Sequence, residues 1–126
     1  GELFDEMRAF ARSSNEGSGD GALDEAIGSL QRATDWIVAN GMPSAAAGAT
    51  PYLELFGIVV GGYLMARSAS IADARLADAN GEASFYRAKI ATARFYAGNI
   101  LPRAGGLERA ATSGSEALMA MTEDAL

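Results

Sequence analysis

The chain has 126 residues, enough for one domain with a buried core, and 49% of them are apolar, which excludes a disordered chain. The net charge of −6 and the single lysine, Lys89, disfavour nucleic acid and anionic membranes, which need clustered basic residues. The sequence contains no cysteine and no histidine, which excludes thiol nucleophiles, Cys/His zinc sites and histidine-dependent triads. We therefore expect no nucleic acid, no membrane and no metal as partners.

Compartment and membrane character follow from the same composition. The absence of cysteine fits a cytoplasmic protein. The uncharged, strongly apolar stretch from Leu55 to Ala66 is shorter than the roughly 20 residues that a transmembrane helix needs. We expect a cytoplasmic protein whose most apolar helix is a core element.

The first segment, from Glu2 to Arg12, has helical spacing and places Phe4, Met7 and Phe10 on one face. It begins without a cap, and Gly1 is typical of a residue left by cloning, so we expect a piece of a longer protein. The alternative is a natural N-terminus that starts in a helix. In a piece of a longer protein, this face and Trp36 would lie bare or be covered by a second copy. Otherwise the segment folds back and completes the bundle.

A second helix is predicted from Ala22 to Ala39, after a glycine-rich loop from Ser13 to Gly21, with Asp20 as a possible cap. Asn40-Gly41 ends it, and Met42 to Ala49 reads as a connector. The expected core stripe of this helix is Leu23, Ile27, Leu30, Thr34 and Ile37, flanked by Ala26 and Ala33.

A long third helix is predicted from Thr50, with Thr50 as cap and Pro51 in the first turn, to about Ala79. Asn80-Gly81 makes a tight turn, and a fourth helix starts at Glu82. So short a connection predicts an antiparallel hairpin, with Ile71 near Ile90 and Leu64 near Ala97.

The remainder of the chain also has helical spacing. Pro102 should kink the fourth helix without ending the helical run, which frays after Thr122. The predicted fold class is therefore all-α, an up-down helical bundle of about four helices with a long central hairpin.

Few residues could carry chemistry, and each has a structural explanation. Gly57 and Gly61 form the spacing of a membrane helix-dimer motif, but nearby charges favour close helix packing in a soluble core. Glu54 and Lys89 would be an acid and a base in an enzyme, yet a salt bridge and a solvent-reaching lysine are far commoner. Trp36 is equally consistent with an interface anchor and with a cover for the flank of the core. We predict no catalytic, cofactor-binding or metal-binding residue in this chain.

Two ordered motifs resemble a known family. They are Thr50 to Gly57 (TPYLELFG) followed by Gly61 to Arg67 (GGYLMAR), and Ala88 to Tyr96 (AKIATARFY) followed by Ile100 to Pro102. They are similar to the C-terminal domain of certain bacterial acyl-CoA dehydrogenases, most closely the methylmercaptopropionyl-CoA dehydrogenase group. The resemblance covers roughly Leu23 to Met121. It implies that residues 1–21 link to an upstream enzyme core and that residues 22–126 form the C-terminal bundle.

The resemblance also implies a function for the parent protein. Such a flavoenzyme removes two hydrogens across Cα–Cβ of an acyl-CoA, with a glutamate as base and FAD as hydride acceptor. The Tyr-Glu-Gly-Thr motif expected around that glutamate does not occur in this chain. The chain is therefore expected to be a non-catalytic domain that binds no FAD and that stabilises or dimerises the parent, with the rest of the parent and further copies as partners. The alternatives are a free-standing interaction module and a small-ligand binder with a cavity between the third and fourth helices.

Overall fold

The computed structural model describes residues 1–13, 21–78 and 81–125, and the described residues form helices and turns without a strand. The elements are α1 (Glu2–Ser13), α2 (Ala22–Asn40), α3 (Ser44–Ala47), α4 (Ala49–Leu76), α5 (Ala83–Asn99), the 3-10 turn η1 (Leu101–Arg103), α6 (Ala104–Ala111) and α7 (Glu116–Ala125). The all-α prediction and the helical bundle are confirmed. Asp20, proposed as a cap, lies outside the described residues.

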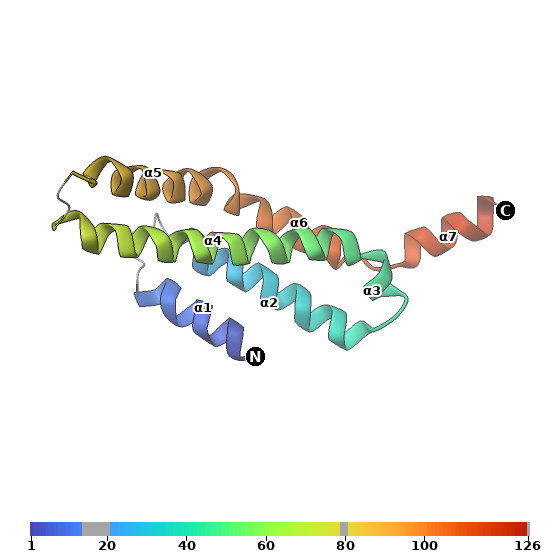
Figure 1. The fold of residues 1–126 in the computed structure, drawn as a ribbon. Helices are drawn as coiled ribbons and strands as arrows, with labels where there is room; N and C mark the ends of the chain where they lie inside the picture. The colour runs from blue at the N-terminus through green and yellow to red at the C-terminus, as the bar shows by residue number, and fades with distance from the viewer. Residues whose placement is uncertain (14–20, 79–80, 126) are drawn as a thin grey trace.

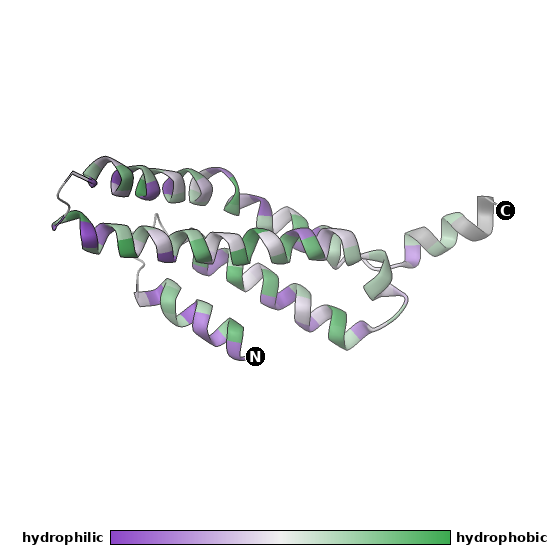
Figure 2. Ribbon diagram, in the orientation of Figure 1, coloured by the Kyte–Doolittle hydropathy of each residue, from purple (hydrophilic) through white to green (hydrophobic). Residues whose placement is uncertain are grey.

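Helix α4 is the central element of the bundle. It packs against α5, α6 and α2, and α2 in turn packs against α1 and α6. Figure 1 shows α4 running between α5 on one side and α1 and α2 on the other. Because α4 has neighbours on several sides, its apolar residues are not confined to one stripe, and Figure 2 shows hydrophobic positions recurring along it.

The core lies where α1, α2, α4 and α6 meet. Its fully enclosed large side chains are Met7, Ile27, Leu30, Leu55 and Val59. The stripe predicted on α2 is confirmed at its buried positions, and Thr34 donates a hydrogen bond to the carbonyl of Leu30 while contacting the Tyr52 hydroxyl.

Helix α1 completes this core within its own chain. Met7 is 0% exposed, and Phe4 and Phe10 pack against the buried cluster as half-buried residues. The Phe10 ring meets the Tyr63 ring edge to face at 5.6 Å between centroids. The expectation that this face lies bare or is covered by a second copy is therefore wrong: the face finds its partners on α2 and α4.

The connection from α2 to α4 differs in detail from the prediction. Gly41, with a φ of 61°, ends α2 by donating its N–H to the carbonyl of Ile37, as the glycine stop predicts. The connector contains the short helix α3, and α4 begins at Ala49, so Thr50 is not its cap. The reason is Gly48: it lies so close to the end of α6 that an added Cβ would overlap the carbonyl oxygen of Ala111.

The antiparallel hairpin of α4 and α5 is confirmed, and α5 is the neighbour with which α4 shares its most extensive contact. Gly81, at a φ of 87°, precedes α5. Pro102 was predicted to kink the fourth helix without ending the helical run. In the structure α5 ends at Asn99, and the 3-10 turn η1, which contains Pro102, leads directly into α6. Helix α7 follows Gly114, which has a φ of 84°, and extends away from the bundle at the end opposite the α4–α5 turn (Figure 1).

One helix in the described part of the chain, α4, is long and apolar enough to cross a membrane by length and composition. The uncharged stretch from Leu55 to Ala66 is only part of α4. The whole helix has 28 residues, and it contains an apolar window long enough to cross a membrane that includes few charged residues. The core helix of a soluble bundle meets the same criterion, and 33% of that window is buried inside this bundle.

Candidate functional site

The larger of two grooves runs between α4 and α5 and has a volume of about 390 Å³. Many of the side chains that line this groove are small, so the two helices leave a space between them that larger side chains would fill. Its walls and ends are formed by Ser13, Leu23, Gly62, Ala66, Ala69, Ser70, Asp73, Ile90, Ala93, Arg94, Tyr96, Ala97 and Leu101. This is the location that the ligand-binding alternative anticipated.

The chemistry of this groove is limited by its polar groups. Asp73 and Arg94 are both exposed residues of its wall. The Tyr96 hydroxyl is engaged, because it donates to the carbonyl oxygen of Ile58 at 2.7 Å. Burial raises the pKa of the Tyr96 phenol, and the positive charge of Arg103 opposes this by less. The groove can accommodate an apolar group, but Tyr96 is a poor proton donor or acceptor near neutral pH.

A second, shallower groove opens between α4 and α5 and has a volume of about 350 Å³. Leu64 lines this groove, whereas Ala97 lines the larger one, so these two residues face different grooves. The lining residues of the shallower groove are Leu64, Met65, Ser68, Phe85, Ala88, Lys89 and Thr92.

The glycines of α4 permit close approach, but not at both predicted positions. A Cβ on Gly61 would lie 2.8 Å from the Tyr96 hydroxyl, and one on Gly62 would lie 2.7 Å from a Leu101 methyl carbon. A Cβ on Gly57 would meet nothing within 4 Å. The close-packing pair is therefore Gly61 and Gly62, and Gly57 faces open space.

Glu54 and Lys89 have the structural roles that the sequence favoured. Arg103 donates to the Glu54 carboxylate at 3.0 Å across the surface. The Lys89 ammonium lies 5.4 Å from the centre of the Phe85 ring. Glu54 and Lys89 belong to two separate contacts, so they do not form an acid–base pair.

Trp36 lies half-buried on α2 beside the segment that joins α6 to α7. A Cβ on Gly114 would be 4.0 Å from its ring atoms. The structure therefore places Trp36 as a cover for the flank of the bundle where the chain turns toward α7.

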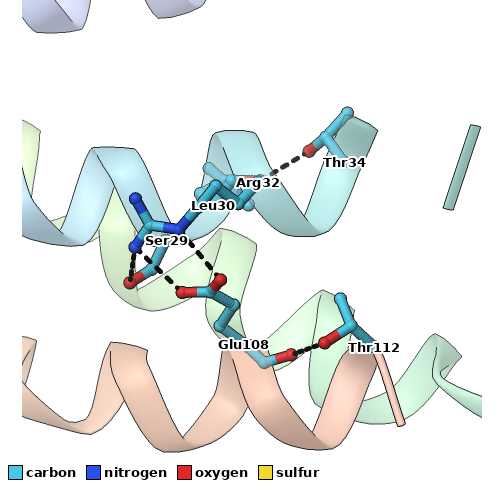
Figure 3. Close-up of polar contacts among 6 residues, drawn as sticks. All are labelled: Ser29, Leu30, Arg32, Thr34, Glu108 and Thr112. Atoms are coloured by element: carbon cyan, nitrogen blue, oxygen red, sulfur yellow. Dashed lines mark hydrogen bonds and ion pairs between the residues drawn. The ribbon is translucent and has the colours of Figure 1, made fainter. Parts of the chain in front are cut away.

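Sequence reasoning did not find the strongest polar link of the bundle, between α2 and α6. Arg32 donates through Nε and Nη2 to the two carboxylate oxygens of Glu108, at 2.9 and 3.0 Å (Figure 3). Arg32 also donates to the Ser29 hydroxyl at 3.4 Å. These hydrogen bonds raise the pKa of Arg32 and lower that of Glu108, although desolvation of each group opposes the shift. The two residues are 76 positions apart, so only the fold brings them together.

No cluster of three or more potential metal ligands occurs among the residues that the structure describes. The grooves and polar links belong to a small helical domain. Residues 3–122 match the family described as acetyl-CoA dehydrogenase C-terminal like. Because the match covers nearly the whole chain, the chain belongs to this family, the C-terminal domains of acyl-CoA dehydrogenases. A search of curated proteins found no match. Membership indicates a soluble protein.

The family implies FAD in the parent enzyme, which raises the question of whether this chain fits that cofactor. A dinucleotide needs backbone N–H groups at a helix N-terminus or a glycine-rich turn to hold its pyrophosphate. The larger groove is lined from mid-helix positions, such as Ala66 of α4 and Ala93 of α5, where the backbone N–H groups already serve the helices. The groove therefore does not fit FAD.

Proposed function

We propose that this chain is a non-catalytic C-terminal domain of an FAD-dependent acyl-CoA dehydrogenase, where it stabilises the parent enzyme by helix packing. The parent would oxidise an acyl-CoA to the 2,3-enoyl-CoA with residues outside this chain. The observation that carries the proposal is the family match across residues 3–122.

The chemistry of the chain supports a packing role. The sequence has neither histidine nor cysteine, and Glu54 and Lys89 are engaged in separate surface contacts. The large apolar residues that remain exposed, such as Leu53 and Phe95, are better suited to contact with other protein surfaces than to catalysis.

The finer assignment is to the methylmercaptopropionyl-CoA dehydrogenase group. It rests on Thr50 to Gly57, Gly61 to Arg67 and Ala88 to Tyr96 in this order. In the structure, these motifs lie in α4 between Thr50 and Arg67 and in the middle of α5. They include Gly61, Gly62 and Tyr96, which set the close approach of the two helices.

The test compares the parent enzyme with a version that ends before Leu3. We expect the shortened enzyme to unfold at a lower temperature and to lose flavin more readily. The purified 126-residue chain alone should show no flavin absorbance. It should also not catalyse the reduction of an electron acceptor by acyl-CoA.

Two outcomes contradict the proposal. Stoichiometric flavin on the isolated chain would place a cofactor site within it. A shortened parent with unchanged stability, flavin content and assembly would leave the domain without a packing role and would favour a free-standing interaction module.

A further inference from the structure

Asn40 and Gly41 form an Asn-Gly pair at the end of α2. In such a pair the backbone nitrogen of the glycine can attack the side-chain carbonyl carbon of the asparagine, because glycine has no side chain to block the approach. The product is aspartate or isoaspartate, and no enzyme is needed. The chain contains a second such pair, Asn80-Gly81, but Asn80 lies outside the described residues.

The reaction balances with water as the only co-reactant. The Gly41 nitrogen gives up its proton and forms a bond to Cγ of Asn40. The bond from Cγ to the side-chain nitrogen breaks, and this nitrogen leaves with the proton as ammonia. Water then adds to one of the two ring carbonyl carbons and breaks the bond of that carbon to the Gly41 nitrogen. Cleavage at Cγ gives aspartate, and cleavage at the backbone carbonyl gives isoaspartate.

In the folded chain both reacting groups are held in other contacts. The Gly41 N–H donates to the carbonyl of Ile37 at 2.9 Å, which closes the last turn of α2. The Asn40 side-chain nitrogen donates to the carbonyl of Trp36 at 2.8 Å. The Gly41 carbonyl in turn accepts from the N–H of Ala45 in α3 at 2.9 Å. The attack therefore requires that the hydrogen bonds of the Gly41 N–H and the Asn40 amide break first.

The end of α2 is the place where these hydrogen bonds can break locally. Val38 is 78% exposed, and Ala39 and Asn40 are exposed as well. The last residues of the helix are therefore not held by burial in the core. Helix ends fray, and such a local opening costs less free energy than unfolding of the whole chain. It releases the reacting groups while the core of the bundle stays folded.

Asn99 at the end of α5 separates the effect of the fold from the effect of the glycine. Its side-chain nitrogen donates to the carbonyl of Phe95 at 3.0 Å, and the N–H of Ile100 donates to the carbonyl of Tyr96 at 2.9 Å. The two helix ends thus have the same pattern of hydrogen bonds. Ile100, however, carries a β-branched side chain, which hinders closure of the ring. Asn99 should therefore remain unmodified whether the chain is folded or not.

We propose that Asn40 is a modification site controlled by local opening of the end of α2. The closed end protects Asn40 and Gly41, and each opening exposes them to conversion into aspartate or isoaspartate. The product cannot restore the closed end, because a carboxylate has no N–H for the Trp36 carbonyl and its charge is unfavourable at a helix C-terminus. Isoaspartate also lengthens the main chain by one atom, which displaces the Gly41 N–H from Ile37. The modification is a one-way change that loosens the link from α2 to α3.

Peptide mass spectrometry of the 126-residue chain, incubated at mildly alkaline pH, tests the proposal. The exchange of the side-chain NH2 for OH gives the mass change, and an isoaspartyl methyltransferase labels the isoaspartate. Conversion of Asn40 should be at least about tenfold slower in the folded chain than in guanidinium chloride. Asn99 should be unmodified under both conditions.

A matched pair of variants tests where the opening occurs. Ala39→Gly and Ala91→Gly replace exposed helical alanines of α2 and α5, so they lower helix propensity alike. A39G should speed the conversion of Asn40 in the folded chain about threefold to fivefold, because it favours opening of the adjacent turn. A91G should leave the rate unchanged. The rates of wild type and A39G in guanidinium chloride correct for the changed neighbour of Asn40.

Three results would overturn the proposal. Equal rates in the folded and the unfolded chain mean that the two hydrogen bonds do not protect Asn40. Equal acceleration by A39G and A91G means that Asn40 reacts only after the whole chain unfolds. No conversion in guanidinium chloride means that the pair is not a modification site. These results concern the chain alone, so they are distinguishable from a failure of the proposed function, which is measured on the parent.

Discussion

The two halves of α4 both carry large apolar residues but have different surroundings. Between Leu55 and Tyr63 the helix contributes most of its buried residues, and they meet α1, α2 and α6. After Tyr63, only Ala72 of α4 is fully buried, although Leu64 and Ile71 are as apolar as the earlier residues. We call the first region, with α1, α2 and α6, the inner half, and the second, with α5, the hairpin arm.

This difference shows that the apolar composition of a segment does not by itself determine how much the segment contributes to stability. Burial within one chain stabilises the fold, and exposed apolar area contributes only when a partner covers it. The inner half should therefore carry the stability of the isolated chain. The hairpin arm is suited to contact with other surfaces, and the following substitutions test this division.

The largest expected effect compares two leucines of α4. Leu55 is 0% exposed and Leu64 is 53% exposed. Leu55→Ala should lower the free energy of unfolding by about 2–5 kcal/mol, because it leaves a cavity. Leu64→Ala should change it by less than about 0.5 kcal/mol at concentrations where the chains are separate. Urea unfolding measures both, and equal losses would show that the two regions do not differ.

A glycine pair tests close contact against open space. Gly48→Ala should destabilise the chain by about 1–3 kcal/mol, because its Cβ would overlap the Ala111 carbonyl. Gly57→Ala meets nothing within 4 Å and should stabilise α4 by up to about 1 kcal/mol through helix propensity. Thermal unfolding distinguishes the two, and a loss at Gly57 in the monomer would contradict the open space assigned there.

The link between the two regions is Tyr96, whose hydroxyl reaches the Ile58 carbonyl from α5. Tyr96→Phe should lower the free energy of unfolding by about 0.5–1.5 kcal/mol. Because burial raises the pKa of Tyr96 in the folded chain, its contribution is complete below the ordinary tyrosine pKa and is lost as pH rises through the folded value. A spectroscopic titration of the wild type against Y96F measures this. An unshifted phenol would contradict the burial.

The smallest effect concerns Arg32 and Glu108 in the inner half. Glu108→Gln should destabilise the chain by no more than about 1 kcal/mol, because the Arg32 side chain is 61% exposed and solvent screens the pair. The pKa of Glu108 is lowered, so its contribution is complete above the ordinary glutamate pKa and is lost as pH falls through the folded value. The difference between wild type and E108Q in urea unfolding should therefore shrink as the pH is lowered below the ordinary glutamate pKa. A difference that persists there would have a source other than charge.

Local signals in the sequence predicted the helices well. The periodicity of α2 and the glycine stop at Gly41 gave that element nearly to the residue, and the short turn gave the hairpin. The predicted start of α4 was wrong because it relied on Thr50 and Pro51, which together form a good local signal for the start of a helix. The close contact of Gly48 with Ala111, which is distant in sequence, sets the actual path.

Features that depend on packing between helices were harder to predict. The four-residue spacing predicted close helix packing at both Gly57 and Gly61. In the structure Tyr96 packs against Gly61 and Gly62 instead, so these two glycines are the covered pair. We predicted that the α1 face would be exposed because nothing in the sequence indicates a partner for a terminal helix. In the structure α2 and Tyr63 bury that face, and no local pattern contains this contact.

The position of Trp36 also has a practical consequence. It is the only tryptophan in the chain, and its ring lies against Gly114, in the link between α6 and α7. Indole fluorescence depends on the polarity of the surroundings, so the emission of this one residue reports selectively on that link. A shift of the emission maximum on dilution, or on addition of the parent enzyme, would follow movement of the C-terminal segment without a label. The chain thus contains its own optical probe at the point where it leaves the bundle.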